Sequence, residues 1–153
     1  MKPNKVKSFT LAEMLVVLVV ASIVISMAFL VLNMVRKQVS SIQQNYNKKQ
    51  LVNTFETFMS RDFNNNIASY DSVKEQLVLS SPKDSIVYLI KATYVIREKD
   101  TFAISIKNKK LFLEGNEVKN NRIDALEINL DLRFSNKKLF FFQHLDASYY
   151  VNQ

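Results

Sequence analysis

Hydrophobic residues follow three different patterns along the chain, and the first pattern covers its N-terminal part. From Met14 to Val35 there is no charged side chain, no Pro and no Gly, and the apolar residues form no helical stripe. At about 1.5 Å per residue, a helix of this length crosses the roughly 30 Å hydrocarbon core of a bilayer. A helix that is apolar all round is surrounded by lipid or by other helices. We therefore predict a transmembrane helix over residues 9–35.

The second pattern is an apolar stripe that continues beyond the predicted membrane segment. The stripe comprises Val35, Val39, Ile42 and Tyr46, and it widens into a face formed by Leu51, Val52, Phe55, Phe58, Met59 and Phe63. Spacings of three and four residues are typical of an amphipathic helix that packs on one side. No Gly or Pro interrupts residues 9–63, which predicts one continuous helix ended by Asn64–Asn66. Residues 36–63 are then an amphipathic half, and a peripheral membrane surface or a coiled-coil seam is the alternative use of its stripe.

The third pattern begins at Gln76, where apolar residues recur with the period of β-strands. Turn-forming residues separate the apolar runs at Pro82–Asp84, Lys107–Lys110, Gly115–Asn116 and Ser135–Lys138. The predicted strands are Leu77–Leu79, Ile86–Ile90, Tyr94–Ile96, Phe102–Ile106, Leu111–Leu113, Ala125–Phe134 and Leu139–Phe142. The Leu51–Phe63 face can cover one side of such a sheet. The predicted fold class is α+β, with a long N-terminal helix packed on a small antiparallel head at residues 64–153.

Length and charge limit the kinds of protein that this chain can be. Its 153 residues allow one membrane segment and one modest domain. The net charge is +7, and removing the three lysines before the apolar run leaves +4, so a nucleic-acid partner is not required. Those lysines outnumber Arg36 and Lys37 on the far side, which favours a cytoplasmic N-terminus. The chain has no cysteine, so its head relies on a packed core without disulfides.

Glu13 is the residue that does not fit an ordinary membrane segment, because a charge there needs a partner or a function. The surrounding sequence, KSFTLAEML at residues 7–15, has a basic leader, a small residue, Phe, and Glu five positions after the leader. It resembles the class III signal of type IV pilins and type II secretion pseudopilins. The order of a long helix, a variable loop, paired strands and a final hairpin most resembles the minor pseudopilins of the J type.

The resemblance implies how the N-terminus is processed and used. A prepilin peptidase would cut between Ser8 and Phe9, removing leader residues 1–8, and would methylate the new Phe9 amine. Ser8 departs from the Gly that the family usually has before the cut. The Phe9 amine of one subunit would then face Glu13 of the next, neutralising both charges and fixing the stagger between helices. The implied partners are other pilin or pseudopilin subunits, the prepilin peptidase and a secretion or pilus assembly platform in the bacterial cytoplasmic membrane. The head would then lie in the periplasm or outside the cell.

Other readings of the same sequence remain open. A cleaved secretory signal would need a small-residue site after the apolar run, and none of A-x-A type occurs near Met27–Asn33. A plain single-pass anchor with a binding head and a tethered enzyme are further alternatives. A competence-type pilin with a DNA-binding head would use basic residues that we expect in solvated turns. These residues are Lys107, Lys109, Lys110, Lys119, Arg122, Lys137 and Lys138.

The sequence offers little for catalysis or metal binding, so we expect neither an enzyme nor a cofactor. His144 is the only histidine, and spacing alone does not make a triad of it with Asp146 and Ser148. One histidine without cysteine excludes a zinc site in practice. The single glycine excludes a phosphate-binding loop. Calcium would need clustered oxygen ligands, for which three aspartates, Asp71, Asp84 and Asp100, are too scattered in sequence.

Overall fold

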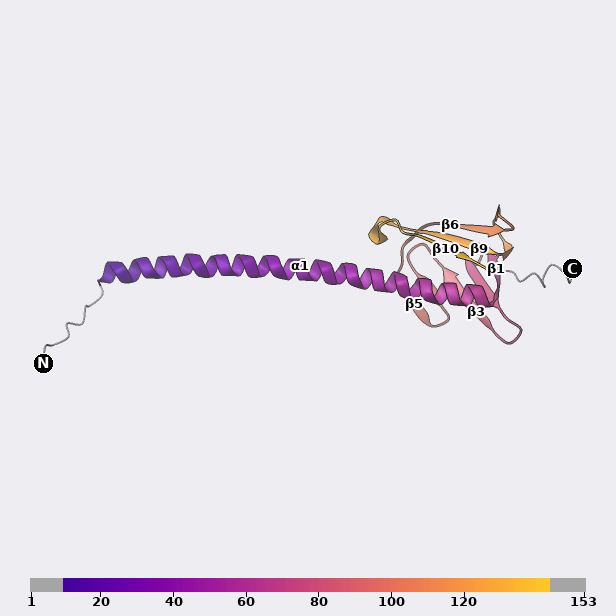
Figure 1. Cartoon of the computed structure of the whole chain (residues 1–153), viewed down its shortest axis with the longest axis horizontal. Coiled ribbons are helices and arrows are strands. Elements are labelled where there is room, and N and C mark those ends of the chain that lie inside the picture. Colours follow the sequence, from indigo (N-terminus) through magenta and orange to yellow (C-terminus); the bar gives the residue numbers. More distant parts are fainter. Residues whose placement is uncertain (1–9, 144–153) are drawn as a thin grey trace. The chain divides into compact units, whose positions relative to one another are not determined.

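The structure is a computed structural model that describes residues 10–143, and it comprises two compact units that meet between Asn45 and Tyr46. One 55-residue helix, α1 (Leu11–Asn65), runs through the boundary (Figure 1). It ends within the predicted Asn64–Asn66 stop, and no Pro or Gly breaks it.

The N-terminal unit consists, among the described residues, of helix alone. Every side chain from Leu11 to Gln50 is exposed, including the apolar ones. Within the described part of the chain, α1 is the one helix long and apolar enough to cross a membrane. The hydroxyls of Ser22 and Ser26 donate to the carbonyls of Val19 and Ser22 at 2.7 Å. The helix backbone therefore satisfies these two hydroxyls, as a lipid environment requires.

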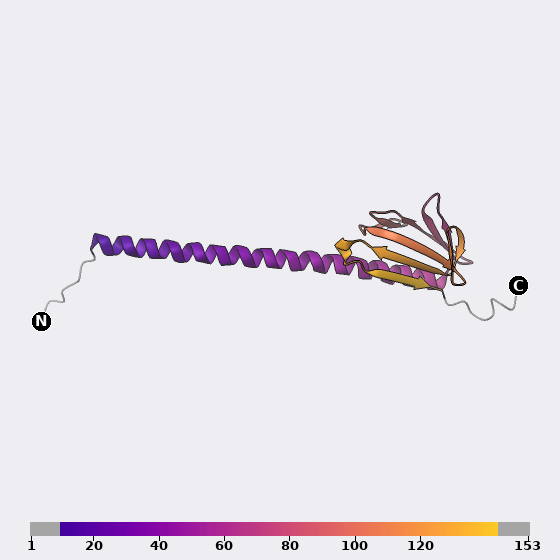
Figure 2. The ribbon, with the colours of Figure 1, turned by 90° about the horizontal axis from the view of Figure 1, so that it is seen from above.

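The second unit contains two antiparallel sheets, where we predicted one. The six-stranded sheet has the order β5-β4-β3-β2-β1-β8, and the four-stranded sheet has the order β10-β9-β6-β7. Figures 1 and 2 show the ribbon from two directions. The first contains β1 (Ile67–Asp71), β2 (Gln76–Ser80), β3 (Ser85–Ile90), β4 (Val95–Arg97), β5 (Asp100–Phe102) and β8 (Asn121–Ile123). The second contains β6 (Ile106–Leu113), β7 (Asn116–Val118), β9 (Ala125–Leu130) and β10 (Lys138–Phe142).

The C-terminal part of α1 packs on both sheets and forms the core with them. The ring of Phe55 lies 5.6 Å from that of Phe102 on β5 and 6.2 Å from that of Phe141 on β10, measured between centroids. Val52, Met59 and Phe63 are buried on the same helical face. The predicted α+β fold, with the wide apolar face of the helix under an antiparallel head, is confirmed.

Hairpins with clear turn signals also match the prediction. The predicted strands at Leu77–Leu79, Ile86–Ile90 and Leu139–Phe142 lie within β2, β3 and β10. Glu114 and Gly115 join β6 to β7 as a two-residue turn with φ of 51° and 79°. Two positive φ values match the right-handed twist of the flanking strands, and glycine adopts such a value without strain.

Three predictions in the head are wrong. Phe102–Ile106 is not a strand, because the chain leaves β5 after Phe102 and enters β6 of the other sheet at Ile106. Ile104 is fully buried in this crossing, so the alternating apolar residues of Phe102–Ile106 reflect burial and not strand pairing. Lys107–Lys110 is not a turn but part of β6, with a register shift between Ile106 and Asn108.

The third wrong prediction is the extension of the last long strand to Phe134. Strand β9 ends at Leu130, and a 3₁₀ helix, η1 (Leu132–Phe134), follows it. Asp131 caps η1 by accepting a hydrogen bond from the Leu132 N–H at 2.6 Å, which stops the strand. Strands β1, β7 and β8 were not predicted, because their sequences contain few large apolar residues.

Candidate assembly site

Helix α1 begins with reciprocal hydrogen bonds between Thr10 and Glu13. The Thr10 hydroxyl accepts from the Glu13 backbone N–H at 3.3 Å. In return, Oε2 of Glu13 accepts from the Thr10 backbone N–H at 3.0 Å and from the Thr10 hydroxyl at 3.1 Å. This arrangement is a capping box, in which the first and fourth residues of the helix start satisfy each other's free N–H groups. Glu13 therefore has a local partner that the sequence analysis missed.

The signal for this capping box is present in the sequence. Thr10 and Glu13 form the T-x-x-E pattern directly before an apolar run. The box holds the carboxylate of Glu13 at the helix N-terminus, where the free N–H groups and the helix dipole favour a negative charge. Both bonds from Thr10 use one carboxylate oxygen, so Oε1 lies outside the box.

The other predicted processing and assembly residues lie outside the described part of the chain. Ser8 and Phe9 precede Thr10, the first described residue. Cleavage between them, methylation of Phe9 and pairing of Phe9 with Glu13 therefore stay predictions.

In the head, Asp62 of α1 is a buried carboxylate with a relative exposure of 3%. Its Oδ2 accepts a hydrogen bond from the Tyr88 hydroxyl at 2.7 Å and one from Nε of Arg97 at 2.7 Å. Nε of Arg61 donates to Oδ1 at 3.2 Å. Burial acts to raise the pKa of Asp62, but the bonds from Arg97, Tyr88 and Arg61 outweigh it and hold the pKa below its ordinary value.

The pKa values of the groups that contact Asp62 are shifted in the directions expected for a stable ion pair. Burial, reinforced by Asp62, raises the pKa of Tyr88, and the hydrogen bond to Asp62 raises the pKa of Arg97. The network ties α1 to β3 and β4, so we assign it to the fold and not to catalysis. The sequence signal for this network is a carboxylate between Met59 and Phe63 on the predicted apolar face.

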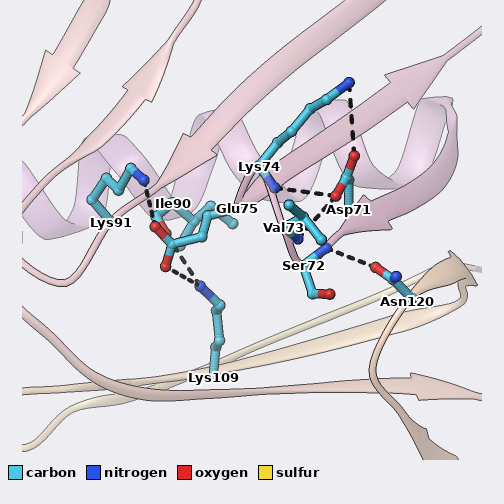
Figure 3. Close-up of polar contacts among 9 residues, drawn as sticks. All are labelled: Asp71, Ser72, Val73, Lys74, Glu75, Ile90, Lys91, Lys109 and Asn120. Carbon is cyan, nitrogen blue, oxygen red and sulfur yellow. Dashed lines mark hydrogen bonds and ion pairs between the residues drawn. The ribbon is translucent and has the colours of Figure 1, made fainter.

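A second polar cluster joins the two sheets (Figure 3). Glu75, at the end of the β1–β2 turn, lies 2.5 Å from Nζ of Lys91 and 3.5 Å from Nζ of Lys109, which comes from β6 of the other sheet. Lys109 also donates to the Ile90 carbonyl at 3.2 Å and stands 5.3 Å from the Tyr70 ring centroid. The hydrogen bond from Lys91 is the main cause that lowers the pKa of Glu75.

Of the seven basic residues proposed for nucleic acid, Lys119 and Lys137 lie between strands as predicted, but the other five lie in strands, which corrects that prediction. Lys107, Lys109 and Lys110 lie in β6, Arg122 lies in β8, and Lys138 begins β10. Between described residues, ion pairs join Lys109 to Glu75, Lys110 to Glu117, Lys137 to Glu56, and Lys138 to Glu127. These four lysines therefore contact carboxylates of neighbouring elements.

The remaining candidates for chemistry are dispersed. Asp71, Asp84 and Asp100 belong to three different hairpins of the six-stranded sheet. Within residues 10–143, no group of three His, Cys, Asp or Glu side chains is arranged to hold a metal ion. His144, Asp146 and Ser148 lie outside the described residues.

Comparison with known proteins identifies the N-terminal motif. Residues 3–29 match the family model of the prokaryotic N-terminal methylation motif, a segment that includes Ser8, Phe9, Thr10 and Glu13. The match supports the type IV pilin and pseudopilin family, and it confirms the resemblance at the level of the N-terminal motif. Together with the apolar first half of α1, it supports a pilin-type protein anchored in a membrane by a single helix. No curated protein and no solved structure matches the chain.

Proposed function

We propose that this chain is a non-enzymatic pilin or pseudopilin subunit that assembles through its N-terminal helix into a pilus-like filament. The observation that carries the proposal is the methylation motif at residues 3–29, which continues directly into the apolar first half of α1. The uncovered side chains from Leu11 to Val35 need lipid or neighbouring helices around them. A subunit that moves from membrane to filament has lipid as its neighbour first and helices afterwards.

Assembly in this proposal depends on the charge of Glu13. Cleavage before Phe9 creates a cationic amine, and the carboxylate of a neighbouring subunit neutralises it in an apolar environment. The capping box supports this role because it holds the carboxylate at the start of α1 while leaving Oε1 outside the box. One carboxylate can therefore serve its own helix and a second subunit together.

The finer assignment rests on the order of elements. A long helix, a strand-rich head and the final β9–β10 hairpin support a minor pseudopilin of the J type in a type II secretion or type IV pilus machine. The proposed partners are other pilin or pseudopilin subunits, a prepilin peptidase and the assembly platform. The proposed location is the cytoplasmic membrane, with the N-terminus in the cytoplasm and the head on the opposite side.

The DNA-binding alternative has less support than filament assembly. Single strands bind where free cations line a groove beside exposed aromatic rings. Three phenylalanine rings do lie together on the four-stranded sheet, with centroid distances of 6.4 Å between Phe112 and Phe140 and 6.3 Å between Phe140 and Phe142. The lysines nearest to them in the strand register, Lys110 and Lys138, are paired with glutamates.

Processing by a prepilin peptidase tests the proposed family role. Co-expression with such a peptidase should shorten the chain by its first eight residues and leave an N-methylated Phe9, as read by intact-mass analysis. Ser8→Gly should be processed at least as well as the parent, whereas Ser8→Glu should remain full length. A mature chain that begins after Ala28 or later would instead identify an ordinary secretory signal and contradict the proposal.

A further inference from the structure

An open cleft of about 450 Å³ lies in the head beside the Asn47–Leu51 turn of α1. Its walls include Lys48 and Leu51 of α1, Ala103 of the β5–β6 crossing, and Arg133 and Phe134 of η1. Leu51 and Phe134 are partly buried against the core, so the floor of the cleft is apolar. Its rim carries two cations and no carboxylate.

The charges around this cleft are not balanced. Within residues 10–143, neither Lys48 nor Arg133 forms an ion pair. Lys137, which follows η1, is already paired with Glu56 at 2.5 Å. Asp131 directly precedes η1, and its Oδ1 accepts a hydrogen bond from the Leu132 N–H. Two cations without an ion pair, in a lining that contains no carboxylate, favour an anionic ligand.

The tip of η1 adds an exposed apolar residue to the cationic rim. Leu132 is 75% exposed, and it directly precedes Arg133 and Phe134, which line the cleft. An exposed leucine beside lysine and arginine is the combination that binds a lipid interface, where the apolar side chain enters the headgroup region and the cations meet phosphates. A soluble anion such as free phosphate would explain the cations but not the leucine.

The anchoring of the chain makes its own membrane the nearest lipid surface. Only residues 36–47 separate Val35, the last residue of the predicted span, from Lys48. As a helix, these twelve residues extend about 18 Å along the chain. The head of an inserted subunit is thereby confined to the neighbourhood of the headgroups, and even weak contacts become populated.

We propose that the cleft and the η1 tip form a binding site for the phosphate headgroups of anionic phospholipids in the membrane that anchors the chain. Lys48 and Arg133 contact the headgroup phosphate, and Leu132 enters the interface beside it. The site holds the head against the membrane before assembly. It requires the membrane anchor but not the filament, so it goes beyond the function proposed above.

A photo-crosslinking experiment on the full chain tests this site. The chain is reconstituted in nanodiscs of phosphatidylcholine alone or of phosphatidylcholine with phosphatidylglycerol, with p-benzoylphenylalanine in place of Leu132. Irradiation should give lipid adducts, identified by mass, in the discs that contain phosphatidylglycerol. The same probe in place of Val73, a residue of the β1–β2 turn that is 88% exposed, should give none. Absence of lipid adducts at position 132, or adducts to a second copy of the chain, would overturn the proposal.

Charge variants separate a lipid site from chance proximity. Lys48→Gln and Arg133→Gln should each lower the adduct yield at position 132 about fivefold, the factor expected for one cation near an anionic surface. Raising the salt to about 1 M should have a similar effect, because the Debye length falls to about 3 Å. Lys83→Gln, in the β2–β3 turn, is the matched control and should leave the yield unchanged. Equal yields in all these variants, or in both kinds of disc, would contradict the assignment.

Discussion

Asp62 shows how a single side chain fixes the orientation of α1 within the head. Its carboxylate receives bonds from three elements at once, namely α1 itself, β3 and β4. A buried ion pair adds little stability compared with a well-packed apolar pair, but removing one partner leaves an uncompensated charge. The cation of Arg97, whose side chain is 14% exposed, would be left in that state.

Asp62→Asn should therefore destabilise the head by about 3 kcal/mol at neutral pH. The folded-state pKa of Asp62 lies below its ordinary value, so its contribution is fully present above the unfolded pKa of about 3.9 and is lost as the pH falls through the lower folded value. Thermal melts from pH 6 to about pH 2 should show this acid-dependent loss in the parent and a smaller loss in Asp62→Asn.

An exposed ion pair supplies the control for this variant. Lys74 and Asp71 lie 3.9 Å apart with side chains 69% and 41% exposed, so Lys74→Gln should cost less than about 1 kcal/mol. Identical melts and acid profiles for the parent and Asp62→Asn would mean that the buried network does not stabilise the fold.

At the scale of elements, the C-terminal part of α1 is the piece on which both sheets depend. Phe55 is fully buried and contacts aromatic rings from each sheet, so its loss opens a cavity that no single strand can fill. The exposed part of the same helix has no such neighbours, as Val39 shows with an exposure of 55%.

Phe55→Ala should lower the free energy of unfolding of the head by about 3 to 5 kcal/mol, a large share of the stability of a small domain. The measurement uses a fragment that begins at Arg36, which should be soluble because its large apolar residues are mostly buried between helix and sheets. Val39→Ala in the same fragment should change stability by less than about 0.5 kcal/mol. An unchanged denaturation midpoint for Phe55→Ala would contradict the helix-on-sheets core.

Sequence patterns predicted the elements in which the spacing of apolar residues alone separates one face from the other. The first half of α1 is apolar all round, its second half has a regular apolar stripe, and the apolar residues of Ala125–Leu130 alternate with polar ones, which leaves few alternatives for these segments. Strand β6 was split because Lys107–Lys110 has the composition of a turn, although its lysines find carboxylates on neighbouring elements. Such pairings between residues distant in the chain cannot be read from local pattern. The division of the strands into two sheets also depends on contacts between distant residues, so it cannot be predicted from local pattern either.

The candidate site was only partly predictable from sequence. Glu13 stood out because a charge borders an uncharged run. Its hydrogen bonds with Thr10 correspond to a T-x-x-E pattern, so this local partner was also predictable from the sequence. The network of Asp62 needed the fold, since Tyr88 and Arg97 are separated from it by 26 and 35 positions.

For the molecule as a whole, folding and assembly use different residues. The core lies entirely after Leu51, whereas the methylation motif and Glu13 lie in the N-terminal unit. A change at Glu13 should therefore leave the head folded and affect assembly alone. The proposed filament subunit would then need the Glu13 charge, whereas a plain membrane-anchored binding domain would need only a hydrophobic N-terminal helix.

The most direct test measures how much of the chain enters sheared filaments in cells that have a matching assembly machine. Glu13→Gln keeps the capping box, since Gln also serves there, but removes the charge. Thr10→Ala removes the capping hydroxyl and keeps the charge. We expect Glu13→Gln and Glu13→Ala to insert in the membrane and fold their heads yet be absent from filaments, Glu13→Asp to be reduced, and Thr10→Ala to be incorporated. Incorporation of Glu13→Gln at the parental level would contradict assembly through the Glu13 charge.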